Sequence, residues 1–106
     1  MSKSSIEFLK HILDESKFVI ENTKGLDYDK FYEDEILKRA VVRSIEIIGE
    51  ASKKVDEEVR DKYDSVDWRS MARTRDKLIH HYFGVDYEIV WNIIEKKLPE
   101  LVYQIQ

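Results

Sequence analysis

Residues 34–55 read DEILKRAVVRSIEIIGEASKKV, and the apolar side chains in this stretch recur every three or four positions. That period places them on one face of an α-helix, because a helix turns by about 100° per residue. We therefore expect a long helix from about Asp34 to Lys54. Its main stripe consists of Leu37, Ala40, Val41, Ser44, Ile47, Ile48, Ala51 and Val55.

Three small or apolar residues of this helix, Val42, Ile45 and Gly49, lie off the main stripe. The helix is therefore apolar on more than one side, and Gly49 would let another backbone approach closely. One explanation is self-association of two copies of the chain through this second face. The other is that several helices surround the long helix within one molecule. The pattern leaves both explanations open.

Similar patterns predict helices before this stretch. A first helix begins at Ser4 or Ser5, either of which can cap it, and ends near Gly25. Asp27 is the next capping candidate and precedes a short polar and aromatic segment at residues 28–33. The apolar positions of the first helix are Ile6, Leu9, Ile12, Leu13, Val19 and Ile20.

Further helices are predicted after the long one. A short helix covers Asp56 to Tyr63, and Asp67 then caps a helix that continues until Gly84 stops it. A last helix starts at Asp86, and Pro99 kinks or restarts it. The fold class is therefore all-α, an antiparallel up-and-down helical bundle with short connections, formed as a single domain by residues 1–106.

Composition agrees with a helical protein and narrows its chemistry. The chain has 106 residues, of which 38% are charged, with one proline and no cysteine. The lack of cysteine excludes a disulfide framework, a thiolate zinc site and a cysteine nucleophile. No stretch resembles a signal peptide or a membrane span, so we expect a soluble, cytoplasmic protein with no membrane partner.

The net charge of −4 argues against general attraction to nucleic acid, so any such chemistry has to be local. A basic patch lies between Arg69 and His81, where four cations outnumber Asp76 to give a net charge of +3. The cations are Arg69, Arg73, Arg75 and Lys77.

Residues 75–82, RDKLIHHY, are the best candidates for chemistry. Arg75 supplies a permanent cation that suits phosphate, and His80 can exchange a proton near neutral pH. Cleavage of RNA without a metal needs a proton acceptor, a proton donor and a cation. In one regular helix, however, His80 would lie about 140° around from Arg75, whereas Tyr82 would return to its face. Either the helix unwinds before Gly84, or a symmetric partner supplies a second copy of the motif.

Simpler interpretations of the same residues remain. Asp76 and His80 are four apart and can meet on one helical face, but no second such pair suggests a metal site, and we expect none. Arg75 can simply pair with an acidic neighbour, and the histidines can end a helix. His11 is expected to be a partly exposed helix residue without a role. Trp68, Met71 and Trp91 are expected to lie in the core rather than to stack on bases.

Two segments together resemble the HepT-like toxins, which have a HEPN domain and were formerly grouped as a domain of unknown function. The first is RAVVRSIEIIGEASKKV at Arg39 to Val55, and the second begins with WRSMARTRDKLIHHYFGVD at Trp68 to Asp86 and extends to Leu101. The resemblance covers nearly the whole chain. It implies a helical HEPN fold, a homodimer, and a metal-independent endoribonuclease without a cofactor.

The resemblance also implies roles for individual residues of an Arg-x4-His-x-Tyr motif in a cleft between protomers. Arg75 would stabilise the phosphate of RNA, His80 would transfer protons, and Tyr82 would be the motif tyrosine. In this family's toxin-antitoxin pairs, a small nucleotidyltransferase antitoxin is associated with adenylylation of that tyrosine. Asp76 stands where many relatives have asparagine, and it could orient His80 or repel RNA; His81 would be a supporting residue.

A second function remains open from the sequence. The chain could be a non-catalytic HEPN-like module that binds nucleotide or RNA, or that holds a nucleotidyltransferase. The net negative charge favours this binding module more than it favours a general nuclease.

Overall fold

The computed structural model describes residues 2–80 and 84–106, with the side chain of His80 left out. Residues 81–83 lie outside the described part of the chain. They include His81 and Tyr82, to which the resemblance assigned roles. The elements in chain order are α1 (Lys3–Thr23), α2 (Tyr28–Glu33), α3 (Glu35–Lys54), α4 (Glu57–Lys62), α5 (Trp68–Ala72), α6 (Thr74–Leu78), β1 (Ile79–His80), β2 (Gly84–Val85), α7 (Tyr87–Asn92), the π-helical turn η1 (Ile93–Lys97) and α8 (Leu98–Ile105).

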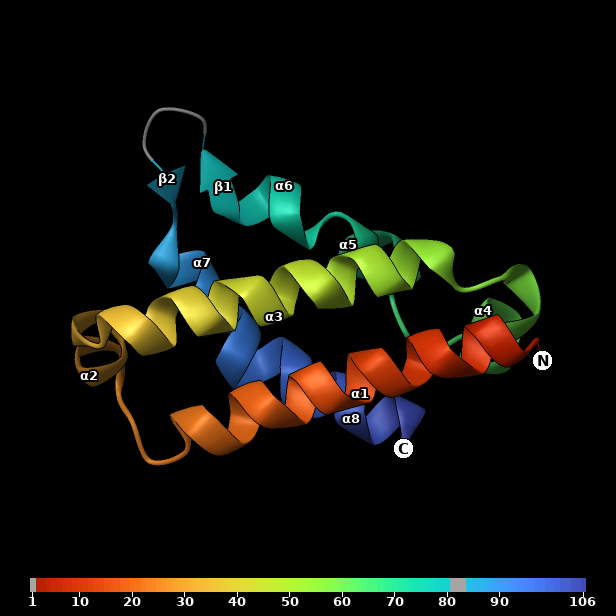
Figure 1. Ribbon diagram of the computed structural model, residues 1–106, viewed down its shortest axis with the longest axis horizontal. Coiled ribbons are helices and arrows are strands. Elements are labelled where there is room, and N and C mark those ends of the chain that lie inside the picture. Colours follow the sequence, from red (N-terminus) through yellow and green to blue (C-terminus); the bar gives the residue numbers. More distant parts are fainter. Residues whose placement is uncertain (1, 81–83) are drawn as a thin grey trace.

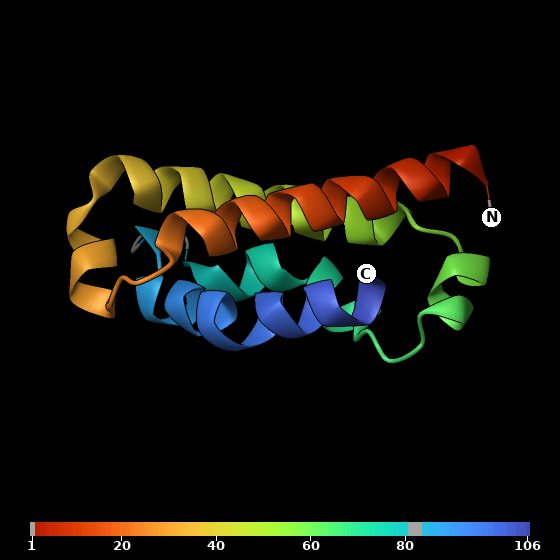
Figure 2. The same cartoon turned by 90° about the horizontal axis from the view of Figure 1, so that it is seen from below.

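The helices form an up-and-down arrangement in two layers. Figure 1 shows α1 and α3 running antiparallel along the length of the molecule, and Figure 2 shows the segment from α5 to α8 packed as a second layer beneath them. The molecule measures 41 × 31 × 20 Å along its principal axes. The predicted all-α bundle is confirmed, apart from a two-residue strand pair in which Ile79 and His80 face Val85 and Gly84.

The core lies between the two layers. Its fully buried side chains come from helices of both layers, which ties the first helix of the chain to the last. These residues include Ile12, Val19, Phe31, Val41, Ile45, Ile48, Leu78, Val90 and Leu98. No helix in the described part of the chain is long and apolar enough to cross a membrane.

The second face of α3 is covered within the same molecule. Val42, Ile45 and Gly49 are all buried, and both α5 and α6 pack on α3. At Gly49 a Cβ atom would lie 3.0 Å from Thr74 Oγ1 and 3.3 Å from the carbonyl oxygen of Met71. The glycine is therefore the position at which the backbones of α3 and the α5–α6 segment come close. The explanation that helices surround α3 in one molecule is confirmed, so this face gives no support for a dimer.

Most predicted helix starts are confirmed by capping hydrogen bonds. The carboxylates of Asp27, Asp56, Asp67 and Asp86 each accept from a backbone N–H in the first turn of the following helix. The start of α1 was predicted wrongly, because Ser2 rather than Ser4 or Ser5 is its cap: the Ser2 hydroxyl accepts from the Ser5 N–H at 3.0 Å.

Asp56 also connects the two long helices of the first layer, because it lies just after the end of α3 and bonds to a residue at the start of α1. Its backbone N–H donates to the Ser5 hydroxyl at 3.4 Å, and its carboxylate accepts from the Val59 N–H at 3.1 Å. Hydrogen bonding of the carboxyl to the Val59 N–H, and after it to the Ser5 hydroxyl, holds the pKa of the Asp56 carboxyl below its ordinary value.

The prediction of one continuous helix from Asp67 to Gly84 was wrong. The helix is interrupted at Arg73, and the Thr74 hydroxyl donates a hydrogen bond to the carbonyl oxygen of Met71 at 2.9 Å. The second helix, α6, ends at Leu78. The Leu78 carbonyl accepts from the Asp86 N–H at 2.7 Å, across the base of the β1–β2 pair. This non-local hydrogen bond takes the carbonyl that a longer helix would use internally.

Pro99 restarts the last helix, as predicted, because α8 begins at Leu98 directly after the π-helical turn η1. The Leu98 N–H bonds to the carbonyl of Ile93, five residues back, in the π-helical turn that precedes α8. A wider turn at this point suits a proline, which has no N–H to donate to the residue four positions earlier. Pro99 then lies in the first turn of α8, where the missing donor has little cost.

Candidate active site

Arg75 is the predicted site residue whose surroundings are best defined. It lies on α6 with 56% of its side chain exposed, and its Nε is 3.5 Å from Oε2 of Glu46 on α3. The Glu46 side chain is 27% exposed, so this pair stands at the edge of the interface between the two helices. The expectation that Arg75 pairs with an acidic neighbour is confirmed.

Glu46 was not recognised from the sequence. It precedes Arg75 by 29 positions, and in the primary structure it is one of several charged residues on a long helix. The close approach at Gly49, less than one helical turn from Glu46, brings α6 onto this part of α3. A signal was present in the pattern, since Gly49 marked a place where another backbone could approach.

The Glu46 contact has a direct consequence for what Arg75 can bind. A guanidinium has five N–H donors in a fixed fork, and the carboxylate of Glu46 lies against the Nε side of that fork. The orientation of the fork is thereby restrained, while most of the side chain is exposed to solvent. Such an arginine is suited to receive a phosphate through its terminal nitrogens.

The backbone of His80 lies in β1 and not in a helix. The helical calculation that separated His80 from Arg75 by about 140° therefore does not apply, because the helix has already ended at Leu78. Of the two ways to bring the motif together, unwinding of the helix before Gly84 is confirmed. For the same reason Asp76 and His80 do not share one regular helix, because α6 ends at Leu78. Tyr82 and His81 lie outside the described residues.

The predicted basic patch is present on the surface of α5 and α6. Arg69, Arg73, Arg75 and Lys77 are all exposed. Three of them, Arg69, Arg73 and Lys77, line a hollow of about 250 Å³ together with Asp67 and Ser70. Arg75 is not among its lining residues, so the patch has two parts.

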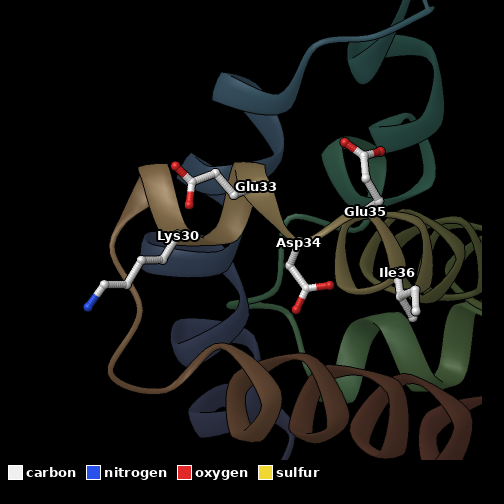
Figure 3. A pocket seen from close by; sticks show the side chains of 5 residues that line it. All are labelled: Lys30, Glu33, Asp34, Glu35 and Ile36. Atoms are coloured by element: carbon white, nitrogen blue, oxygen red, sulfur yellow. The ribbon is translucent and has the colours of Figure 1, made fainter.

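A larger pocket at the junction of α2 and α3 is a poor candidate for RNA. It is lined by Lys30, Glu33, Asp34, Glu35 and Ile36, so that three carboxylates outnumber one cation. Figure 3 shows these side chains pointing in different directions, with Lys30 directed away from the carboxylates. Asp34 already caps α3, and Glu35 pairs with Lys38 at 3.1 Å. This pocket has the wrong charge for a phosphate chain.

Trp68, Met71, Trp91 and His11 lie where the sequence indicated. Trp68 and Met71 are buried, and the Trp68 indole N–H donates to the carbonyl of Tyr63 at 3.0 Å. Trp91 is partly buried against Phe31, with ring centroids 5.3 Å apart. His11 is an exposed residue of α1. Within residues 2–80 and 84–106, no three histidine, aspartate or glutamate side chains gather in a way that could hold a metal ion.

Comparisons with known proteins give one family. The family described as "Ribonuclease HepT-like" matches residues 6–106. A protein of Caldanaerobacter subterraneus subsp. tengcongensis named "Putative RNase" is 49% identical over 104 residues, covering 98% of this chain and 93% of its own. A "Putative RNase" of Methanocaldococcus jannaschii is 46% identical over 99 residues, covering 93% and 82%.

A third relative carries the family's name. The "Probable ribonuclease HepT" of Thermococcus cleftensis is 38% identical over 101 residues, which cover 95% of this chain and 92% of its own. No significant match to a solved structure was found. The family match spans the long helix α3, the Arg75–Glu46 pair and the β1–β2 pair, and together with these relatives it shows that the chain belongs to the HepT-like ribonuclease family.

Proposed function

We propose that this protein is a metal-independent endoribonuclease, in which Arg75 stabilises the phosphate and His80 transfers protons. The observation that carries the proposal is the exposed guanidinium of Arg75, restrained by Glu46 and five residues before a histidine, in a chain of the HepT-like ribonuclease family. Neither group needs a metal to act on a phosphodiester, since arginine supplies charge and histidine supplies proton transfer.

The proposed reaction is an internal transesterification of RNA. The 2′-oxygen attacks the adjacent phosphorus, and the bond from phosphorus to the 5′-oxygen breaks. The products are a 2′,3′-cyclic phosphate on one fragment and a 5′-hydroxyl on the other. One group removes the proton from the 2′-hydroxyl, and another gives a proton to the leaving 5′-oxygen. Arg75 stabilises the extra negative charge that develops on the phosphate oxygens.

A homodimer would supply both proton-transfer groups. We propose that two copies of the Arg-x4-His-x-Tyr motif line one cleft across a two-fold axis, so that one imidazole accepts a proton and a second donates one. Asp76 lies four residues before His80 and His81 directly follows it, and both would affect the charge around His80. Glu46 acts as a positioning residue, because it holds Nε of Arg75 and so aims the terminal nitrogens of the guanidinium.

We further propose that the enzyme is the toxin of a type II toxin-antitoxin pair. Its antitoxin would be a small nucleotidyltransferase that adenylylates Tyr82. In that reaction the tyrosine oxygen attacks the α-phosphate of ATP, pyrophosphate leaves, and the phenolic proton passes to a base. The added phosphate would lie in the same motif as Arg75 and compete with RNA for its charge.

The test of the proposal compares two arginines. Arg75→Ala and Arg39→Ala are assayed for RNA cleavage and for inhibition of cell growth. Arg39 is a matched control, because it is also exposed and also pairs with a glutamate, Glu35, at 3.8 Å. We expect Arg75→Ala to lower kcat by about 10²- to 10³-fold, the effect of removing one group that stabilises charge in a transition state. Arg39→Ala should retain activity.

Two results would contradict the proposal. Cleavage and toxicity that survive Arg75→Ala would exclude the assigned role of this residue. Binding of RNA or nucleotide without cleavage by the wild-type protein would favour the binding module, the second function that the net charge of −4 supports.

A further inference from the structure

We propose that the hollow formed by Arg69, Arg73 and Lys77 is a second phosphate site, which holds the backbone of single-stranded RNA a few nucleotides away from the phosphate that is cleaved. The choice of RNA as the ligand rests on the proposed function. The site itself is separate from the motif, and its three cations have no part in the proton transfers proposed for His80.

The hollow is a concentration of free positive charge in an acidic protein. Its volume is about 250 Å³, and three of its five lining residues are cations. Five other cations of the described residues lie within ion-pair distance of a glutamate, namely Lys10, Lys38, Arg39, Lys53 and Arg75. In the same part of the chain, no carboxylate lies within that distance of the three cations of the hollow.

The one carboxylate that lines the hollow is already engaged. Asp67 caps α5, with Oδ1 accepting from the Ser70 N–H at 3.0 Å. The ammonium of Lys77 is held toward the hollow by a 2.6 Å hydrogen bond to the Ser70 hydroxyl. Lys77 thus joins α6 to α5 across the break at Arg73, and a phosphate in the hollow could accept from Lys77, Arg69 and Arg73 together.

The position of the hollow relative to Arg75 gives the expected path of the RNA. Lys77 is two residues after Arg75 on α6. Two residues correspond to a rotation of about 200° around the helix axis, so the two side chains leave opposite sides of the helix. Arg75 lies toward Glu46 on α3, whereas Lys77 lies toward Ser70 on α5. A strand that crosses α6, whose diameter with side chains is about 10 Å, would place one phosphate at Arg75 and another in the hollow.

The break in the α5–α6 segment gives the hollow its shape. In an unbroken helix, Arg69, Arg73 and Lys77 would form a straight ridge at intervals of four residues. The turn at Arg73 bends that ridge, so that its cations surround a concave space. The sequence pattern alone indicated a basic patch and could not indicate a pocket.

The experiment measures RNA binding in the His80→Ala background, so that cleavage does not interfere. The probe is a fluorescein-labelled uridine oligonucleotide of about 16 nucleotides, within the range of known single-strand sites. Binding is measured by anisotropy at several salt concentrations for the triple variant Arg69→Gln, Arg73→Gln and Lys77→Gln. A control triple variant, Lys3→Gln, Lys17→Gln and Lys24→Gln, removes the same charge from exposed positions at α1.

We expect the hollow variant to bind more weakly and to lose part of its salt dependence. Three phosphate contacts, each contributing about 0.7, should lower the slope of log affinity against log salt by about 2. Arg69→Lys with Arg73→Lys should retain the slope, because charge is preserved. The control variant should keep the wild-type slope within error. Thermal unfolding followed by circular dichroism checks that all variants are folded.

Several outcomes would overturn the inference: an unchanged slope in the hollow variant, an equal loss in the control variant, or no RNA binding by the His80→Ala protein. Uridine monophosphate is a second probe. If the hollow variant no longer binds uridine monophosphate but binds RNA as the parent protein does, the hollow is a site for a free nucleotide instead. Because binding is the readout, the result is independent of cleavage. If the wild-type protein does not cleave RNA but the slope still falls by about 2, the phosphate site stands and the proposed function fails.

Discussion

Gly49→Ala is expected to destabilise the protein by disturbing the contact that places α6 on α3. In an exposed helix the change would gain about 1 kcal/mol from helix propensity. Here the new Cβ would lie 3.0 Å from the Thr74 hydroxyl oxygen and 3.3 Å from the Met71 carbonyl oxygen. Neither oxygen can move easily, because the two are hydrogen-bonded to each other at 2.9 Å.

Overpacking of a core contact costs roughly 1–3 kcal/mol. Because the gain in helix propensity offsets part of this cost, we expect Gly49→Ala to lower the free energy of unfolding by about 1 kcal/mol. Urea denaturation followed by circular dichroism measures this value. With a slope of about 2 kcal/mol per M, the midpoint should fall by about 0.5 M urea.

A double-mutant cycle locates the source of the effect. Thr74→Ala removes the hydroxyl that the new methyl group meets first, so Gly49→Ala should be less costly in that background, with a coupling energy of about 0.5–1 kcal/mol. Stabilisation by Gly49→Ala of about 1 kcal/mol in both backgrounds would refute the reasoning. It would mean that α3 and the α5–α6 segment do not approach as closely as the structure shows.

Three further predictions concern the site, the caps and the core. Glu46→Gln should lower kcat by about 10- to 100-fold with little change in KM, because Arg75 loses its restraint; initial rates on an RNA substrate test this, and unchanged kinetics would remove the positioning role. Asp56→Asn keeps a side-chain acceptor at the cap but removes the charge. Since the pKa of Asp56 in the folded protein is below its ordinary 3.8, the stability that its ionised form contributes is present above that pH and is lost as the pH falls through the folded-state value. The stability difference between wild type and variant, from urea curves at several pH values, should therefore be constant near neutrality and shrink below about pH 4; a constant difference down to pH 2 would contradict this. Phe31→Ala removes a fully buried ring that packs on Trp91 and should cost about 3–5 kcal/mol in urea unfolding, and a loss below 1 kcal/mol would contradict the assignment of the core.

Helix starts were predictable where the signal is local. Asp27, Asp56, Asp67 and Asp86 cap helices through hydrogen bonds that span two or three residues, and such bonds follow from the sequence of a single turn. The start of α1 was misplaced because several serines follow one another. Ser5 is buried and accepts from the Asp56 N–H, a partner 51 positions away, which leaves Ser2 as the cap.

The interruption of the helix after Ala72 was not predictable from periodicity. Met71, Leu78 and Ile79 continue the helical pattern, so propensity alone favours one unbroken helix. The hydrogen bond from Asp86 to Leu78, and the pairing of Ile79 with Val85, depend on the return of the chain after Gly84. Tertiary pairing thus overrides the local preference.

The candidate site was predictable only in part. The sequence indicated Arg75 as a candidate, because an arginine before a pair of histidines suggests phosphate chemistry. It could not identify Glu46, since that contact depends on the packing of α6 against α3 at Gly49. The second apolar face of α3 showed that something covers it, but apolarity alone does not say whether the cover belongs to the same molecule.

The central claim, a histidine-dependent ribonuclease that needs no metal, is tested most directly by the ends of its products. Wild-type protein and His80→Ala are each incubated with RNA in EDTA, and the fragments are analysed for 2′,3′-cyclic phosphate and 5′-hydroxyl ends. The account predicts cyclic phosphate ends from the wild type alone, at a rate that the chelator does not change. Equal cleavage by both proteins, or cleavage that EDTA abolishes, would contradict it.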